Sequence, residues 1–264
     1  MQAPISLQDT WIAYYDTFII HNIMGPQAHS FVARIQAAGK KATFQVSDLY
    51  NDKMYLVCDY ITVTSRYFGD LLASQFGDHK VRVIMDAWEN PDDVIKREYV
   101  QSRGTPSAVW FGCANSNYFY ARDKVVPLLH HAGWDSYFIT IHDTADMQYD
   151  HKTVYQALVK HDICFIPSVL LEEHKCKSPN RVVQSMVLGL PIICSPVPDY
   201  IPVVRTFRNG YVAYSQQDWV TYLIALKDQT TRERIGKQAR LDVLEPFSLK
   251  RQTEEWEAFL KEVV

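Results

Sequence analysis

The stretch DICFIPSVLLEEHKCKSPNRVVQSMVLGLPIIC, residues 162–194, contains a strand, a loop, a helix and a second strand in that order. The apolar run at 162–167 has the length of a strand, and the segment after Pro179 becomes an apolar helix. Gly189 ends that helix, and Pro191 prevents its continuation. The order predicts two parallel strands joined by a right-handed crossover helix.

The same alternation of strands and helices extends in both directions along the chain. We predict strands at 17–20, 41–46, 60–64 and 81–85, then at 107–112, 136–142, 162–167, 192–194 and 209–215. A polar segment broken by Pro91, Gly104 and Pro106 separates the two series. The predicted fold class is therefore α/β, with two Rossmann-like domains at 1–100 and 105–264.

Composition narrows the class of protein. The 264 residues are 47% hydrophobic and 22% charged, which is enough for a full core, and the net charge of -3 argues against a nucleic-acid binder. No window approaches the ~20 apolar residues of a membrane span, and the N-terminus lacks the regions of a signal peptide. Five scattered cysteines without a CxxC pair indicate reduced thiols. We therefore expect a cytoplasmic protein.

The start of the helix after residue 178 carries an unusual charge pattern. Ser178 is predicted as the N-cap and Pro179 as the first helical residue. Lys177 and Arg181 then lie at the positive end of the helix dipole, which disfavours each cation by roughly 0.3–1 kcal/mol. A bound phosphate would reverse that sign, with Ser178 and Asn180 as neutral donors.

A surface cluster is the alternative explanation of the two cations, because Glu172 and Glu173 in the preceding loop could neutralise them. Position favours a binding site. In doubly wound sheets, ligands bind at the carboxyl ends of the strands. The loops at those ends are predicted at 21–26, 47–52, 112–117 and 168–177.

The ordered segments KSPNR, GLPIICSPVPDY, NGYVAY, DWVTYLIAL and RERIGKQAR, followed by a Trp-bearing last helix, resemble a known family. Residues 105–264 are similar to the C-terminal nucleotide-sugar-binding domain of GT-B glycosyltransferases, of the glycosyl transferases group 1 or family 4-like type. Residues 15–95 resemble a shortened form of the family's N-terminal, acceptor-side domain. The KSPNR variant resembles a subset associated with bacterial surface polysaccharides.

The resemblance implies transfer of a sugar from a nucleotide-diphosphate sugar to a glycan or lipid-linked acceptor. By the same resemblance, Lys177, Asn180 and Arg181 would hold the donor diphosphate, and the two cations would stabilise the leaving group. The family usually has glutamates at the positions of Cys176 and Gln184. Gln184 can still hydrogen-bond a ribose hydroxyl.

Further donor-site residues are implied in two loops. The Arg and Lys that many members carry after the first strand of this domain are replaced by Gly112, Asn115 and Asn117, which offer close backbone approach and neutral donors. Asp199 and Tyr200 match the family's loop near the sugar and phosphate.

Two residues of the N-terminal half are catalytic candidates. His21 follows a strand, where family members often place a histidine near the donor sugar; a structural histidine is the alternative. Asp48 could act as general base toward a sugar hydroxyl, although a helix N-cap is an equal interpretation.

We expect no metal and no cofactor, because the chain has no Asp-x-Asp pair and its His and Cys residues are isolated.

An alternative function is a catalytically idle GT-B-like module that binds nucleotide or glycan and supports another transferase. The expected partners are the nucleotide sugar and the acceptor. Peripheral membrane association, a homo-oligomer and a partner chain stay open.

Overall fold

The computed structural model describes residues 10–90, 92–100, 104–113 and 115–263, and these form two compact units. Unit 1 comprises Met1–Met85 with Gln252–Val264, and unit 2 comprises Asp86–Arg251. These units differ from the predicted boundaries at two places. The last helix joins the N-terminal unit, and the segment from residue 86 to 100, predicted as a connection, belongs to unit 2.

Unit 1 is built on a parallel sheet of four strands in the order β1-β2-β3-β4. The strands are β1 (Thr17–His21), β2 (Lys41–Val46), β3 (Tyr60–Val63) and β4 (Val81–Val83). The helices of the unit are α1 (Thr10–Tyr14), α2 (Pro26–Ala37), α3 (Met54–Val57), α4 (Arg66–Phe76) and α12 (Leu249–Val263). All four strands and three of these helices follow the predicted pattern, whereas α1 and α3 were not predicted.

The local signals in unit 1 explain how its elements begin and where α12 packs. The Ser65 hydroxyl accepts the Phe68 N–H at 3.2 Å, so the predicted N-cap of α4 is confirmed. α12 returns to this unit because Phe259 packs edge-on against Tyr60, with ring centroids 5.8 Å apart. α12 also forms an ion pair between Glu262 and Arg82 and a hydrogen bond from Gln252 to the Met85 carbonyl at 3.0 Å.

Unit 2 has a parallel sheet of six strands in the order β10-β9-β8-β5-β6-β7. The strands are β5 (Ser107–Phe111), β6 (Asp135–Thr140), β7 (Met147–Gln148), β8 (Ile163–Ile166), β9 (Ile192–Cys194) and β10 (Tyr211–Val212). Starting from β5, the strands β6 and β7 are added on one side of it, and β8, β9 and β10 are added on the other side. The strand order therefore reverses between β5 and β8, which is where ligands bind in such sheets.

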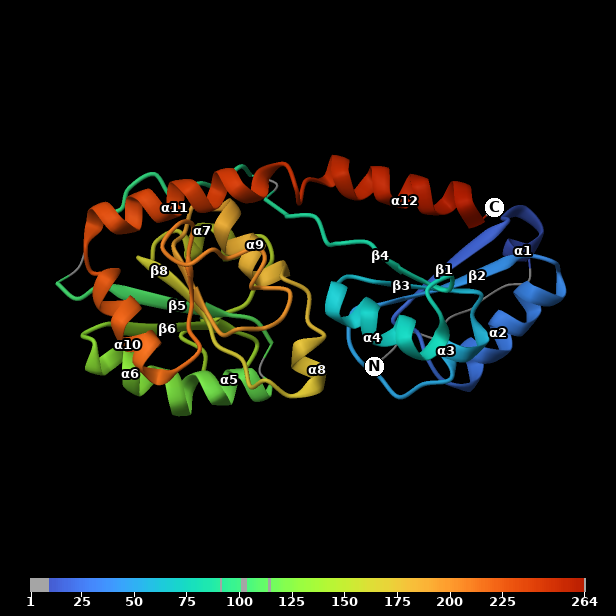
Figure 1. Ribbon diagram of the computed structural model, residues 1–264, viewed down its shortest axis with the longest axis horizontal. Helices are drawn as coiled ribbons and strands as arrows, with labels where there is room; N and C mark the ends of the chain where they lie inside the picture. Colours follow the sequence, from blue (N-terminus) through green and yellow to red (C-terminus); the bar gives the residue numbers. More distant parts are fainter. Residues whose placement is uncertain (1–9, 91, 101–103, 114, 264) are drawn as a thin grey trace. The chain divides into compact units, whose positions relative to one another are not determined.

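Helices cover both faces of this sheet (Figure 1). α7 (Val154–Leu158), α9 (Asn180–Val187) and α11 (Gln229–Leu244) pack on one face, and α5 (Ser116–Tyr120), α6 (Val126–His131) and α10 (Gln216–Ala225) on the other. α8 (Glu172–Lys175) is a short turn before α9. Between α5 and α6 lies a π-helical turn, Ala121–Val125. Pro127 explains it, because proline has no N–H to continue an α-helical ladder.

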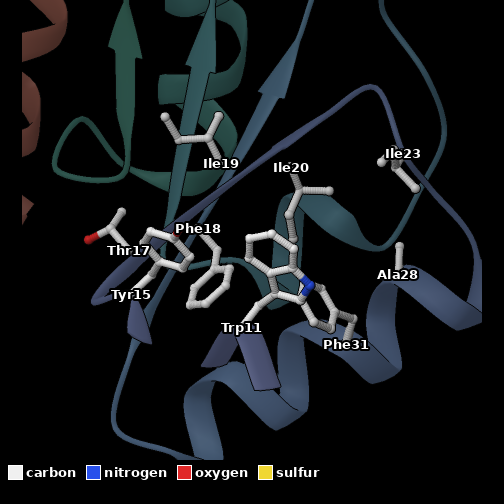
Figure 2. A pocket seen from close by; sticks show the side chains of 9 residues that line it. All are labelled: Trp11, Tyr15, Thr17, Phe18, Ile19, Ile20, Ile23, Ala28 and Phe31. Carbon is white, nitrogen blue, oxygen red and sulfur yellow. The ribbon is translucent and has the colours of Figure 1, made fainter. Parts of the chain in front are cut away.

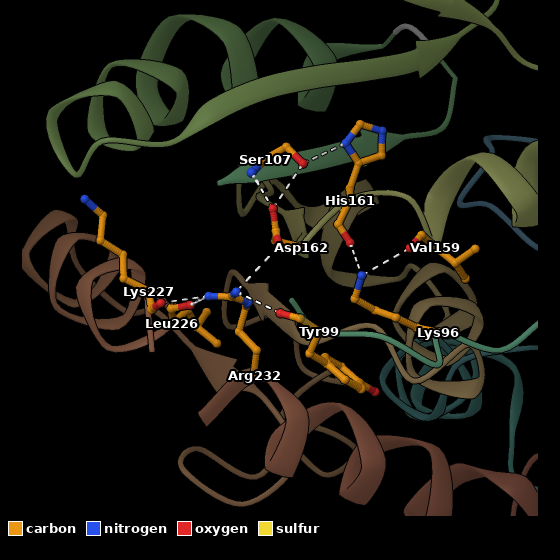
Figure 3. A network of polar contacts seen from close by, with 9 residues as sticks. All are labelled: Lys96, Tyr99, Ser107, Val159, His161, Asp162, Leu226, Lys227 and Arg232. Carbon is orange, nitrogen blue, oxygen red and sulfur yellow. Dashed lines mark hydrogen bonds and ion pairs between the residues drawn. The ribbon is translucent and has the colours of Figure 1, made fainter. Parts of the chain in front are cut away.

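A buried arginine connects four segments at the amino ends of the strands of this sheet (Figure 3). These ends lie opposite the carboxyl ends, where ligands bind in such folds. Arg232 is 1% exposed, and its guanidinium donates to the carbonyls of Leu226 and Lys227 at 2.8 Å each. It also donates to the Tyr99 carbonyl at 3.0 Å and lies 3.6 Å from the carboxylate of Asp162. That carboxylate in turn accepts the backbone N–H of Ser107 at 2.8 Å.

The segment before β5 is part of the core of unit 2. The Lys96 ammonium donates to the carbonyls of Val159 and His161 at 3.1 and 2.7 Å, and burial lowers the pKa of this lysine to about 8. The Tyr99 hydroxyl donates to the Gly189 carbonyl at 2.6 Å, just beyond the end of α9. These contacts explain why a stretch with the composition of a linker packs as a structural element.

Replacing Arg232 by methionine should destabilise the protein by about 3–5 kcal/mol, because the carboxylate of Asp162 then stays buried without its cation. Urea unfolding followed by circular dichroism measures the change. The control is Lys237→Met on the same helix, whose exposed pair with Glu233 is worth at most about 1 kcal/mol. Equal losses in the two variants would contradict the assignment.

Gly236→Ala should also destabilise unit 2. A Cβ at this position would lie 2.2 Å from the Gly189 carbonyl oxygen and 2.6 Å from the Tyr99 hydroxyl, so α11 and the end of α9 would have to separate. Overpacking of this kind costs about 1–3 kcal/mol. Gly104→Ala is the control, since a Cβ there meets nothing within 4 Å. Thermal unfolding of the two variants side by side tests the difference.

Candidate functional site

The candidate site lies in unit 2 at the carboxyl ends of β5 and β8, where α9 begins. The predicted cap of this helix is wrong: the N-cap residue is Pro179, and no side chain caps the first turn. The Ser178 hydroxyl instead donates to the Asp86 carboxylate at 3.0 Å. A charged acceptor forms a stronger hydrogen bond than a neutral one, and the sequence around residue 178 gives no sign of this distant partner.

Arg181 reaches from the first turn of α9 to the end of β5. Its Nη1 donates to the Phe111 carbonyl at 3.1 Å, and the guanidinium lies 5.5 Å from the ring centre of Trp110. It also hydrogen-bonds the buried Tyr200, which follows β9. One side chain therefore joins the ends of β5 and β9 at the start of α9.

The surface-cluster alternative assigned Glu172 and Glu173 to the two cations. In the structure Glu172 pairs with Lys175 on its own short helix, at 3.4 Å. Lys177 is half-buried and lies near the Cys176 thiol. Burial raises the pKa of that thiol to about 11, so Cys176 is neutral at physiological pH.

Gly112 is required at the turn after β5. Its φ is 144°, and a Cβ would lie 3.0 Å from Nη1 of Arg181. The sequence predicted a close backbone approach here by a ligand. The structure shows that the arginine of α9 makes such an approach itself, so a side chain at 112 would displace the guanidinium.

The side chains of Asn115 and Asn117 are engaged within the protein. Asn115 caps α5 by accepting the N–H of Asn117 at 3.0 Å. Asn117 is buried; its Oδ1 accepts the N–H of Val169 at 2.9 Å, and its Nδ2 lies 3.3 Å from Nδ1 of His174. Asn117 thus fixes the loop after β5 to the loop after β8, a role that the sequence analysis did not assign, and Asn115 holds the first turn of α5.

The other predicted donor-site residues lie around α9. Gln184 is buried, and its Oε1 accepts the N–H of Glu89 at 3.2 Å, so its carbonyl is occupied and its amide N–H groups are what it can offer. Asp199 is buried beside Tyr200. The Oδ1 of Asn180 is buried without a hydrogen-bond partner among the described residues. An orphaned acceptor at a helix start is suited to a ligand that donates, such as a hydroxyl.

The two catalytic candidates of unit 1 lie at the carboxyl ends of β1 and β2. His21 is exposed, and its Nε2 lies 3.1 Å from the side-chain nitrogen of Asn22. Asp48 accepts the Tyr50 hydroxyl at 3.3 Å, and burial together with this carboxylate raises the pKa of that tyrosine.

Sequence reasoning missed a carboxylate–imidazole pair in the same part of unit 1. Asp52 contacts Nε2 of His29 at 2.7 Å and accepts the backbone N–H groups of Gly25 and Met54. The hydrogen bond from His29 and the backbone donors lower the pKa of Asp52 in spite of its partial burial. The two residues lie far apart in sequence, and no spacing signal connects them.

Within the part of the chain that the structure describes, no cluster of three or more His, Cys, Asp or Glu residues could hold a metal ion. Within the same residues, no helix has the length and apolar character that crossing a membrane requires.

The arrangement can bind an anion that also carries hydroxyl groups. The first N–H groups of an eight-residue helix, a half-buried lysine and a guanidinium held by three contacts meet at one sheet edge. Arginine has five N–H donors, and the contacts with Phe111 and Tyr200 leave some of them for a ligand oxygen.

No protein-family model and no curated protein sequence matches the chain. Solved structures do. HepE of Anabaena, determined in complex with UDP and glucose, is 12% identical with a TM-score of 0.70, over 96% of this chain and 80% of HepE. TarM of S. aureus is 10% identical with a TM-score of 0.68, over 92% of this chain but only 54% of TarM. The chain thus spans about half the length of TarM.

A third match has the same architecture. Sucrose-phosphate synthase of Thermosynechococcus elongatus is 12% identical with a TM-score of 0.67, over 96% of this chain and 75% of the enzyme. At such identities the likeness establishes the fold alone. Together with the two α/β units described above, it confirms the predicted fold class: the chain has the GT-B fold of glycosyltransferases.

Proposed function

We propose that the protein is a glycosyltransferase that moves a sugar from a nucleotide-diphosphate donor to a glycan or lipid-linked acceptor in the cytoplasm. One observation carries the proposal: Lys177 and Arg181 lie at the start of α9, at the sheet edge where the strand order reverses. The fold supports it, because solved structures of similar fold include HepE with UDP-glucose. The KSPNR stretch supports a role in surface polysaccharide synthesis.

In this proposal the donor diphosphate lies at the first turn of α9. Its negative charge is met by the helix N–H groups, by Lys177 and by the guanidinium of Arg181. Gly112 lets the guanidinium lie close to the β5 turn. A ribose or sugar hydroxyl can donate to the orphaned Oδ1 of Asn180.

The same cations would carry the catalysis. Charge develops on the diphosphate as the bond to the sugar breaks, and fixed positive groups that already point there stabilise the transition state without reorganisation. This electrostatic role lets a pair of cations replace a divalent ion, so we propose transfer without a metal. His21 and Asp48, at the carboxyl ends of β1 and β2, are the candidate catalytic residues of this proposal.

A catalytically idle nucleotide- or glycan-binding module is the second candidate. The neutral, buried Cys176 and the engaged Gln184 favour it, because no carboxylate stands at either position. Both candidates share the binding site. Hydrolysis or transfer of the sugar of a bound donor separates them, since an idle module binds the nucleotide and releases no sugar.

Lys177→Met should weaken UDP binding by about 10- to 100-fold, the loss of one charge-assisted hydrogen bond of ~1.5–3 kcal/mol. Isothermal titration with UDP measures it. Lys175→Met is the matched control, because it removes the same charge two residues away from a side chain that pairs with Glu172. Unchanged affinity in the Lys177 variant would refute the donor site.

UDP affinity should be the same within about two-fold in EDTA and in millimolar magnesium, since the diphosphate charge is met by side chains and helix N–H groups. The titration is repeated in the two buffers with the unaltered protein. A magnesium requirement would show that a metal holds the diphosphate and would contradict this part of the proposal.

A further inference from the structure

β1 is the outermost strand of the sheet of unit 1, and among the residues that the structure describes no strand pairs with its outer edge. The Lys41 N–H donates to the Asp16 carbonyl, and the Asn22 N–H donates to the Gln45 carbonyl. Even-numbered residues of β1 therefore bond to β2. Backbone groups alternate in direction along a strand, so the N–H and C=O groups of Thr17, Ile19 and His21 point away from the sheet.

An apolar groove of about 340 Å³ follows this edge (Figure 2). None of the nine lining residues is charged: Trp11, Tyr15, Thr17, Phe18, Ile19, Ile20, Ile23, Ala28 and Phe31. Trp11 stacks on Tyr15, which meets Phe18 edge-on, so the aromatic wall is continuous. Trp11 is 53% exposed, Tyr15 51% and Ile19 43%. Apolar surface gathered along an open strand edge marks an interaction site.

We propose that this edge pairs with β1 of a second copy of the chain, antiparallel and across a two-fold axis at Ile19. In that register Ile19 faces its own copy, and Thr17 faces His21 of the partner subunit. All three have outward backbone groups, so each facing pair exchanges both N–H···O=C hydrogen bonds. The two sheets then join into one.

The side chains suit a second copy, because in each facing pair the residue of one copy is compatible with the residue opposite it in the other copy. On one face, Ile19 meets an identical apolar residue, and Thr17 lies opposite the imidazole of His21 of the partner subunit. On the other face, Phe18 lies opposite Ile20 of the partner subunit, next to the aromatic wall. No like charges meet in this register, which is the condition that an isologous interface must satisfy.

A two-fold pairing also ends the assembly. Each copy uses its β1 edge once, so no open β1 edge is left to recruit further chains. The proposal does not depend on the donor site, because it concerns unit 1 alone. Its test measures the mass of the assembly in solution and not the enzymatic activity.

Sedimentation equilibrium of the full chain should give twice the monomer mass at micromolar concentrations. Ile19→Lys should give monomers, because two ammonium groups meet on the axis, and Ile19→Glu should do the same. An equimolar mixture of the two variants should recover the dimer, since opposite charges now face each other. Leu241→Lys, the same apolar-to-lysine change at an exposed leucine of α11, should leave the dimer intact.

The recovery in the mixture distinguishes a broken interface from a misfolded variant, because misfolded chains do not reassociate. A monomeric unaltered protein at all concentrations overturns the proposal and leaves the groove for a strand of another protein. A dimer that persists in the Ile19→Lys variant overturns it as well, because the contact then lies elsewhere.

Discussion

The ion pair between Arg232 and Asp162 is the constraint on which unit 2 depends. Burying two charges costs several kcal/mol per ion, and only good geometry with further hydrogen bonds offsets that cost. Here the guanidinium bonds three carbonyls and the carboxylate bonds the start of β5. The pair thus fixes the amino ends of β5 and β8, the turn into α11 and the segment before β5. The carboxyl ends of the same strands are left for the site.

The position of α9 follows from this arrangement. α11 packs against it at Gly236, where only glycine allows the Gly189 carbonyl to approach, and Tyr99 hydrogen-bonds that same carbonyl. Arg240 of α11 donates to the Val187 carbonyl in the last turn of α9, where a cation is favoured by the helix dipole. The carboxyl end of α9 is therefore fully held by the protein. Its amino end has no side-chain cap, so its N–H groups stay available.

The sequence was sufficient to predict those secondary-structure elements whose hydrophobic pattern is local and several residues long. The strand and helix periods predicted the strands β1 to β6 and β8 to β10 and the longer helices, and Ser65 was a correct cap. The short elements α1, α3, α8 and β7 were missed, because elements of two to five residues are held by tertiary contacts rather than by propensity. The composition around Lys96 predicts a linker, and the structure differs for the same reason: the Lys96 ammonium donates to carbonyls more than sixty residues away.

The same limit applies to the site. Lys177, Arg181 and Gly112 were found from charge, helix position and a turn residue, which are local signals. The roles of Ser178, Asn117 and His29 depend on partners that sequence spacing does not connect. Polar side chains with several donors and acceptors can form many alternative pairs, and only the fold selects among them.

The two cations of α9 differ in what they can reveal about function. Arg181 has three partners inside the protein, and its stacking over Trp110 together with the Phe111 carbonyl gives a structural reason for a cation at this helix end even without ligand. Substituting it would disturb the β5 turn and the affinity together. Lys177 is the sharper reporter, because it stands outside the helix and its neighbour Lys175 provides the same charge in a known ion pair. A loss of nucleotide affinity in the Lys177 variant, with none in the Lys175 variant, assigns the effect to position 177 and not to the net charge of the loop.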